Sequence, residues 1–81
     1  MTSASSIQPG LRILRLRHVQ NRIGLSRSTI YDRLNRASPR YDSKFPLPIR
    51  LGGTAVGWLE SDIDEWILGR IIDAEKSRLM P

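Results

Sequence analysis

Apolar residues in the first half of the chain recur at the spacing of one helix face. The first set follows an i, i+3, i+7 pattern: Leu16, Val19 and Ile23. Gly24 predicts the end of that helix, and Ser26 is a favourable N-cap for a second helix over residues 27–37. Ile30 and Leu34 are the inner positions of the second helix. Two short helices joined by a tight glycine turn indicate a helix-turn-helix.

Beyond residue 46 the apolar residues no longer follow helical spacing and instead occupy every second position. Apolar residues alternate on both sides of a Gly-Gly pair: Leu47, Ile49 and Leu51 before it, Val56 and Trp58 after it. This pattern predicts a hairpin over residues 47–59 with its turn at Gly52 and Gly53. A two-residue or four-residue loop places all these apolar side chains on one face, whereas a three-residue loop would turn one strand over and expose Val56 and Trp58.

A third helix is predicted after the hairpin. The sequence Ser61-Asp62-Ile63-Asp64 resembles a capping box, so we expect the helix to begin at Ser61. An apolar stripe predicts about four turns packed on the other elements: Ile63, Trp66, Ile67 and Ile71. With a short strand at residues 12–14, the order is strand, helix, helix, hairpin, helix. The predicted fold class is α+β, a small winged helix-turn-helix over residues 11–78, preceded by a disordered, Ser-rich tail at residues 1–10.

Length and composition exclude several classes of function. A chain of 81 residues forms one domain, and its hydrophobic content of 40% is that of an ordinary folded protein. Because it has no cysteine and a single histidine, His18, we expect no disulfide, metal site or cofactor, and no enzymatic activity. The absence of a long apolar run and of a signal peptide predicts a cytoplasmic protein without a membrane segment.

Charge is distributed unevenly along the chain. Residues 1–50 contain ten basic and two acidic residues, whereas residues 51–81 contain three basic and six acidic ones. Nine of the ten basic residues in the first part are arginines, whose planar guanidinium suits phosphate and guanine. This asymmetry favours a polyanionic partner, namely nucleic acid; the alternative is a solvated basic surface that serves solubility.

The outward side of the second helix is the predicted DNA-reading surface. Its candidate residues are Ser26, Arg27, Ser28, Thr29, Tyr31, Asp32 and Arg36. We expect the free N–H groups and hydroxyls at the helix start, with Arg27, to bind phosphate. Arg27, Ser28, Tyr31 and Asp32 should lie nearest the bases. Two interpretations of Asp32 stay open: it accepts from a cytosine amino group, or it pairs with Arg36.

The hairpin tip is the predicted second contact. Its candidates are Arg50, Gly52, Gly53 and Thr54, assisted by Lys44. They offer cations, unshielded backbone amides and a hydroxyl at a protruding turn, as a wing along the adjacent groove or backbone requires. The alternative is an ordinary surface turn in which the glycines serve backbone geometry alone.

Three blocks of sequence resemble the AlpA family of phage and prophage regulators. They are Gly24-Leu25-Ser26-Arg27-Ser28-Thr29-Ile30-Tyr31, Phe45-Pro46-Leu47-Pro48-Ile49-Arg50-Leu51-Gly52 and Ala55-Val56-Gly57-Trp58-Leu59-Glu60-Ser61-Asp62-Ile63. The resemblance implies a winged helix similar to the DNA-binding domain of MerR-type regulators and to phage excisionases. It also implies control of integrase or excision genes, with recognition by Ser26, Arg27, Ser28, Thr29 and Tyr31. Asp32 departs from the basic residue of many relatives, and the longer loop at 37–44 leaves Arg40 and Tyr41 without a role.

The leading functional hypothesis is a sequence-specific regulator of transcription that binds double-stranded DNA. An excisionase-like architectural factor that bends DNA for recombination is the alternative within the same class. A different class is a protein-interaction module that uses an apolar patch near the C-terminus: Ile71, Ile72, Leu79 and Met80. Further candidate partners are a second copy of the chain on DNA, integrase and RNA polymerase.

Overall fold

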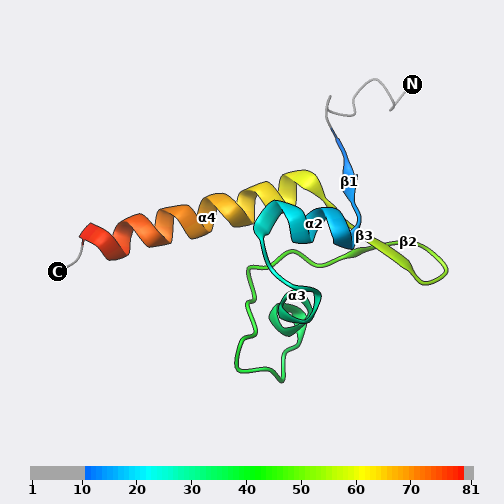
Figure 1. The fold of residues 1–81 in the computed structure, drawn as a ribbon, viewed down its shortest axis with the longest axis horizontal. Coiled ribbons are helices and arrows are strands. Elements are labelled where there is room, and N and C mark those ends of the chain that lie inside the picture. The colour runs from blue at the N-terminus through cyan, green and yellow to red at the C-terminus, as the bar shows by residue number, and fades with distance from the viewer. Residues whose placement is uncertain (1–10, 80–81) are drawn as a thin grey trace.

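The computed structural model describes residues 11–79, which form three strands and three helices (Figure 1). The elements are β1 (Ile13–Leu14), α2 (Leu16–Ile23), α3 (Arg27–Leu34), β2 (Ile49–Gly52), β3 (Ala55–Leu59) and α4 (Glu60–Leu79). This order confirms the predicted α+β class and is compatible with a winged helix-turn-helix. The tail predicted at residues 1–10 lies outside the described residues. Within residues 11–79, no helix combines the length and the hydropathy needed to cross a bilayer.

The turn between α2 and α3 follows the sequence prediction. Gly24 ends α2 in the left-handed conformation, with φ 72° and ψ 24°, and its N–H donates to the carbonyl of Gln20 at 2.8 Å. Glycine adopts this conformation without the steric cost that a side chain brings. Leu25 packs against the core, and Ser26 then caps α3. The chain therefore reverses direction between the two helices within a few residues.

The second helix is shorter than predicted. It ends at Leu34 rather than Ala37, because Asn35 adopts an extended conformation with φ −89° and ψ 111°. The Asn35 side-chain oxygen accepts the N–H of Ala37 at 3.0 Å, a local turn that competes with helix continuation. Arg36 therefore lies in the following loop, exposed but no longer on the outer face of the helix.

The hairpin pairs in a different register from the predicted one. Ile49 lies opposite Gly57 and Arg50 opposite Val56, and an irregularity then shifts the pairing so that Gly52 lies opposite Ala55. Because β2 is offset by one residue, its apolar side chains do not share a face with Val56 and the buried Trp58. The prediction that every large apolar group of the hairpin lies on one face is wrong, and β2, not β3, is the strand turned over.

Gly57 leaves room for β1 beside the central strand. The sheet order is β1-β3-β2, with both neighbours antiparallel to β3. A Cβ at Gly57 would lie 2.5 Å from Ile13 Cγ2 and 3.0 Å from the carbonyl oxygen of Leu14, so a side chain here would collide with β1. Glycine at position 57 therefore lets β1 lie close to the central strand, beside the paired residues Trp58 and Leu59.

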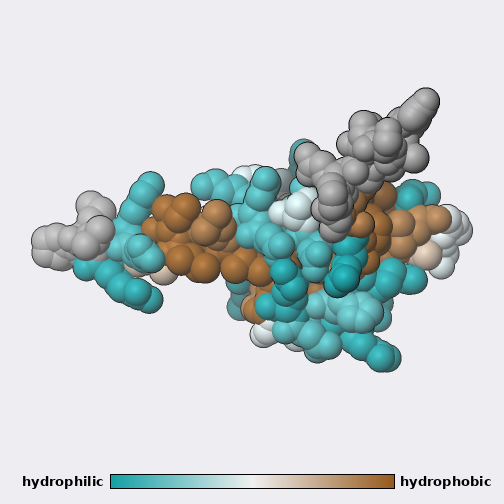
Figure 2. Space-filling view, turned by 90° about the horizontal axis from the view of Figure 1, so that it is seen from above, coloured by the Kyte–Doolittle hydropathy of each residue, from teal (hydrophilic) through white to brown (hydrophobic). Residues whose placement is uncertain are grey.

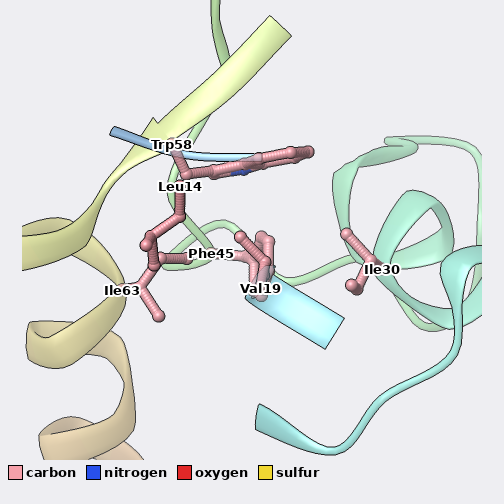
Figure 3. Packing of buried hydrophobic residues seen from close by; sticks show 6 residues of the cluster. All are labelled: Leu14, Val19, Ile30, Phe45, Trp58 and Ile63. Carbon is pink, nitrogen blue, oxygen red and sulfur yellow. The ribbon is translucent and has the colours of Figure 1, made fainter. Parts of the chain in front are cut away.

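Six buried side chains form the core, and they come from nearly every element: Leu14, Val19, Ile30, Phe45, Trp58 and Ile63 (Figure 3). Trp58 is fully buried, and its indole N–H donates to the carbonyl of Pro46 at 3.1 Å. Trp66 packs edge-on against Phe45, with ring centroids 5.0 Å apart. The expectation that both tryptophans pack in or against the core is confirmed.

The last helix begins one residue earlier and extends farther than predicted. It starts at Glu60, directly after β3, and runs for 20 residues to Leu79, about 30 Å. The Glu60 N–H donates to the carbonyl of Arg12 at 2.8 Å, which continues the β1–β3 pairing into the helix start. Ser61 therefore lies inside the first turn instead of capping it. Ile71 is exposed and does not join the core stripe.

Candidate nucleic-acid interface

The start of α3 is organised by hydroxyl groups. The Ser26 Oγ accepts the backbone N–H of Thr29 at 3.2 Å and shares a hydrogen bond with the Thr29 hydroxyl at 2.9 Å. The Ser28 hydroxyl lies 3.3 Å from the same Ser26 oxygen. This cap satisfies one of the N–H groups at the helix start, while those of Arg27 and Ser28 precede the first i→i−4 bond. No acidic side chain stands in the first turn, so the positive end of the helix dipole is uncompensated there.

The outward face of α3 is open. Arg27, Ser28 and Tyr31 are all exposed, while Ile30 on the other side is buried in the core. The Arg27 guanidinium lies 5.7 Å from the centre of the Tyr31 ring, a cation–π arrangement that holds the two side chains together one turn apart. The structure thus unites two candidate DNA-reading residues, a planar cation and a phenol, on one uncovered surface.

The ion-pair partner of Asp32 is not Arg36, which the sequence suggested. Its Oδ2 lies 3.8 Å from Nη1 of Arg40, and both side chains are substantially exposed. Because α3 ends at Leu34, Arg36 is not on a helix four residues from Asp32, and the pairing of Asp32 with Arg36 is wrong. Arg40, which had no assigned role, instead offsets the carboxylate charge on this face.

The hairpin tip is exposed and projects from the body at the end opposite the C-terminal end of α4 (Figure 1). Its exposed candidates are Arg50, Gly52, Gly53 and Thr54. Gly52 and Gly53 have positive φ values of 135° and 54°, so the turn requires residues that tolerate this backbone. The structure therefore brings these four candidates together, as expected.

Lys44 lies apart from the hairpin tip. It lines an open groove of about 460 Å³ beside Trp66, and four carboxylates share that groove: Asp42, Asp62, Glu65 and Asp73. The negative charge around Lys44 offsets its attraction for phosphate. Among the candidates, Lys44 is therefore the least suited to the role predicted for it.

Acidic side chains neutralise the arginines nearest α4 but not those of α3 and the hairpin. Arg22 pairs with Asp64 at 2.6 Å and with Glu60 at 3.6 Å, and the hydrogen bond to Asp64 raises the pKa of Arg22. Across residues 11–79, in contrast, no carboxylate lies within 4.0 Å of the guanidinium groups of Arg27 and Arg50. Uncompensated positive charge is therefore present at the two places predicted to contact DNA.

The loop between α3 and β2 is anchored by contacts that sequence reasoning missed. The Asp42 carboxylate accepts the Trp66 indole N–H at 2.9 Å and the Lys44 backbone N–H at 2.9 Å. The Asp42 N–H in turn donates to the carbonyl of Arg33 at 2.9 Å. The turn around Asp42 is a recognisable local signal, but its tryptophan partner is 24 residues away and has no sequence signature. Asp42 thus joins the end of α3 to α4.

We expect Asp42→Asn to reduce the stability of the fold at neutral pH. We also expect the stability of this variant to fall less than that of the wild type when the pH is lowered. Burial acts to raise the pKa of Asp42, but the Trp66 and Lys44 hydrogen bonds and the charges of Arg70 and Arg33 together hold it below its usual value. A depressed carboxyl pKa stabilises the fold above the unfolded value of about 3.9, and this stability is lost as the pH falls through the folded pKa.

Urea midpoints measured at neutral pH and below about pH 4 test this expectation. The difference between the two midpoints should be smaller in Asp42→Asn than in the wild type. Glu75→Gln, which removes an exposed carboxylate from α4, is the matched control and should keep the wild-type difference. An unchanged pH dependence in Asp42→Asn would contradict the anchoring role.

Comparison with known proteins agrees with this geometry. The model of the Prophage CP4-57 regulatory protein (AlpA) family matches residues 12–71, from the start of β1 to the middle of α4. A DNA-binding transcriptional activator AlpA of Escherichia coli (strain K12) is 53% identical over 60 residues, covering 74% of this chain and 86% of that protein. An uncharacterized protein, ORF88, of Enterobacteria phage P4 is 42% identical over 60 residues, covering 74% of this chain and 61% of its own length. No solved structure matches this chain. The chain belongs to the AlpA family of prophage regulatory proteins.

Proposed function

We propose that this protein is a sequence-specific, double-stranded DNA-binding regulator of transcription of the prophage type. Arg27 and Tyr31, paired on the uncovered face of α3, are the observation that carries the proposal. The name of the Escherichia coli relative, a DNA-binding transcriptional activator, supports it. Function in the cytoplasm, where such DNA is found, is part of the same proposal.

In this proposal α3 enters the major groove. The N–H groups at its start, with the hydroxyls of Ser26, Ser28 and Thr29, bind a backbone phosphate. Arg27 and Tyr31 then reach base edges, because their side chains extend outward one turn apart. The charge of Asp32, the residue after Tyr31, is partly offset by Arg40, which reduces its repulsion of phosphate. Arg36, displaced into the loop, contributes a backbone contact rather than base reading.

The β2–β3 hairpin acts as the wing. Arg50 supplies a cation, and Gly52, Gly53 and Thr54 present backbone N–H groups and a hydroxyl at the exposed tip. Contacts of this kind go to phosphate and sugar and position a protein without reading sequence. Recognition is therefore divided between two elements: α3 reads the base sequence, and the hairpin positions the protein on the DNA.

An excisionase-like architectural role is the alternative. The small size of the domain supports it, because such factors bind DNA as several adjacent copies. A single module of this kind buries only about 600–1,000 Å² on DNA, so useful specificity requires adjacent copies. Association of copies on DNA and contacts with integrase or RNA polymerase belong to this proposal. Footprinting separates the roles: several adjacent sites at an attachment region indicate architecture, and one promoter site indicates transcriptional control.

Selection of bound sequences from a random duplex pool tests the proposed function. We expect enrichment of a short consensus sequence. Recovery of the pool without enrichment, or failure to retain duplex at low salt, would overturn sequence-specific binding.

We expect Arg27→Ala to weaken binding to the selected site by about 1–3 kcal/mol and to relax the preference for its bases. Arg50→Ala should weaken binding to selected and scrambled duplexes by equal factors, because a phosphate contact carries no sequence information. Fluorescence anisotropy titrations on both duplexes measure the two effects.

Arg12→Ala is the matched control for these substitutions. It also removes one arginine, but this arginine is already paired with Glu60 at 3.9 Å. Its binding constants should stay close to those of the wild type. Equal losses on both duplexes for Arg27→Ala would refute base reading by that residue.

A further inference from the structure

Arg15 joins the start of α2 to the hairpin. Its backbone carbonyl accepts the Val19 N–H at 3.0 Å, which is the first hydrogen bond of α2. Its side-chain Nε donates to the carbonyl of Val56 in β3 at 3.0 Å, across 41 residues of sequence. Arg15 is not among the residues proposed to contact DNA, yet it stands where the helix-turn-helix meets the proposed wing.

The Arg15 side chain completes an edge of β3 that β1 leaves open. The Glu60 N–H points toward the β1 side, where it donates to the carbonyl of Arg12 at 2.8 Å. Backbone groups of a strand alternate between its two neighbours, so those of Val56, four residues earlier, point to the same side. The strand residue opposite Val56 would be Leu16, but the chain has already turned into α2 there. The Nε of Arg15 therefore donates where a strand N–H is missing.

Val56, the residue held by Arg15, lies directly opposite the cation of the proposed wing. It pairs with Arg50 across β2 and β3. Side chains of directly opposed residues in an antiparallel pair are neighbours on the same face of the sheet. Arg50 is exposed, and within residues 11–79 its guanidinium has no carboxylate within 4.0 Å. The position of Arg50 therefore follows from the position of Val56.

Packing on the core does not hold β2 in place. All four residues of this strand are exposed, with Ile49 and Leu51 at 41% and 44%, and Figure 2 shows apolar side chains at the surface of this end of the molecule. In the sheet order β1-β3-β2, β2 has β3 as its single neighbour. The hydrogen bond to Val56 lies closer to the hairpin tip than the pairing with β1, which ends at Trp58. The direction of the hairpin is therefore set through β3, where Arg15 holds it.

We propose that Arg15 is a positioning residue for DNA binding, an inference that rests on the proposed function. By holding the Val56 carbonyl, Arg15 fixes the hairpin relative to the helix-turn-helix, so that Arg50 and α3 reach the same duplex together. It acts through the hairpin and not by its own contact with DNA. Because wing contacts carry no sequence information, its loss should weaken binding to selected and scrambled duplexes alike.

Two substitutions separate the hydrogen bond of Arg15 from its charge. In Arg15→Gln the side-chain Nε2 lies the same number of bonds from Cα as the arginine Nε, so the donor is kept and the charge is removed. Arg15→Lys keeps the charge but places a methylene at that position and moves its donor one bond farther out.

Fluorescence anisotropy titrations at one salt concentration compare these variants on both duplexes. We expect Arg15→Lys to bind about 3- to 10-fold more weakly than the wild type, which corresponds to the loss of one hydrogen bond. Arg15→Gln should bind more tightly than Arg15→Lys. A direct phosphate contact by Arg15 would give the opposite order. Equal affinities of the two variants, or tighter binding by Arg15→Lys, would overturn the positioning role.

A double-mutant cycle tests whether Arg15 acts through the hairpin. The combined loss of affinity in Arg15→Lys with Arg50→Ala should be smaller than the product of the two single losses, because both changes remove the same wing contact. Arg15→Lys with Arg27→Ala is the matched control, and its loss should equal the product. Full multiplication in both pairs would overturn the positioning role. A shortfall in both pairs would also overturn it, since that result indicates general damage to the fold.

Amide hydrogen exchange of the free protein separates failure of this role from failure of DNA binding. Exchange in the β2–β3 hairpin should be about 3- to 10-fold faster in Arg15→Lys than in the wild type, while exchange in α3 stays unchanged. Arg15→Gln should keep the wild-type rates in both elements. Wild-type hairpin exchange in Arg15→Lys would overturn the positioning role, whereas a wild type that retains no duplex would overturn the proposed function instead.

Discussion

Trp58→Ala is expected to leave most of the chain unfolded at 25 °C. Trp58 is fully buried at the centre of the core (Figure 3), and truncation of such a side chain costs about 3–5 kcal/mol. A folded unit of this size is stabilised by about 0.05–0.15 kcal/mol per residue, or roughly 3–10 kcal/mol in total. The loss is therefore comparable with the entire free energy of unfolding. The indole hydrogen bond to Pro46 is lost as well.

Urea unfolding, followed by far-ultraviolet circular dichroism and by the fluorescence of Trp66, measures this loss. Trp58→Phe is the informative control, because it retains an aromatic ring but cannot donate to the Pro46 carbonyl. We expect an intermediate stability for it. A Trp58→Ala protein with a near wild-type urea midpoint would show that the core does not depend on this residue.

Raising the salt concentration from about 50 to 200 mM is expected to lower the DNA affinity by roughly 500- to 4,000-fold. Contact with about five to seven phosphates gives a slope of log affinity against log salt of about −4.5 to −6, because bound counterions are released from the DNA. The uncompensated guanidinium groups of Arg27 and Arg50 are among the cations that make these contacts in our proposal.

The same titration on Arg50→Ala should give a slope shallower by about 1, because one phosphate contact is lost. Arg12→Ala, whose arginine is paired with Glu60, should keep the wild-type slope. A flat salt response of the wild type would contradict a DNA-binding surface built from arginines.

The helix-turn-helix could be predicted because its signals are local. Gly24 ends α2 through a backbone conformation that depends on one residue, and Ser26 caps α3 through a contact three residues away. Part of the candidate surface of α3 followed from the same periodicity, because burial of Ile30 places Ser28 about 160° and Tyr31 about 100° around the helix from it. Arg27 was expected to be accessible for another reason, namely its position at the N-terminal end of the helix.

The end of α3 shows how a weak local preference limits prediction. Helical periodicity continues formally to Ala37, but the Asn35 side chain bonds to the backbone and terminates the helix at Leu34. The preference of an Asn side chain for bonding to the nearby backbone instead of continuing a helix is worth only a small free energy. The spacing of apolar residues carries no information about this preference. Because α3 ends at Leu34, Arg36 lies in the loop, and Arg40 instead of Arg36 is the partner of Asp32.

Sequence alone determined the order of the elements, the helix-turn-helix and the uneven charge, since each arises from residues close together in the chain. Only the tertiary structure decided the strand register, the partner of Asp32 and the anchoring of Asp42 by Trp66. Gly57 of β3 lies against Ile13 of β1, and the contact between Asp42 and Trp66 spans 24 residues. Such contacts form between residues that are distant in the chain, so their geometry exists only after the core around Trp58 has assembled.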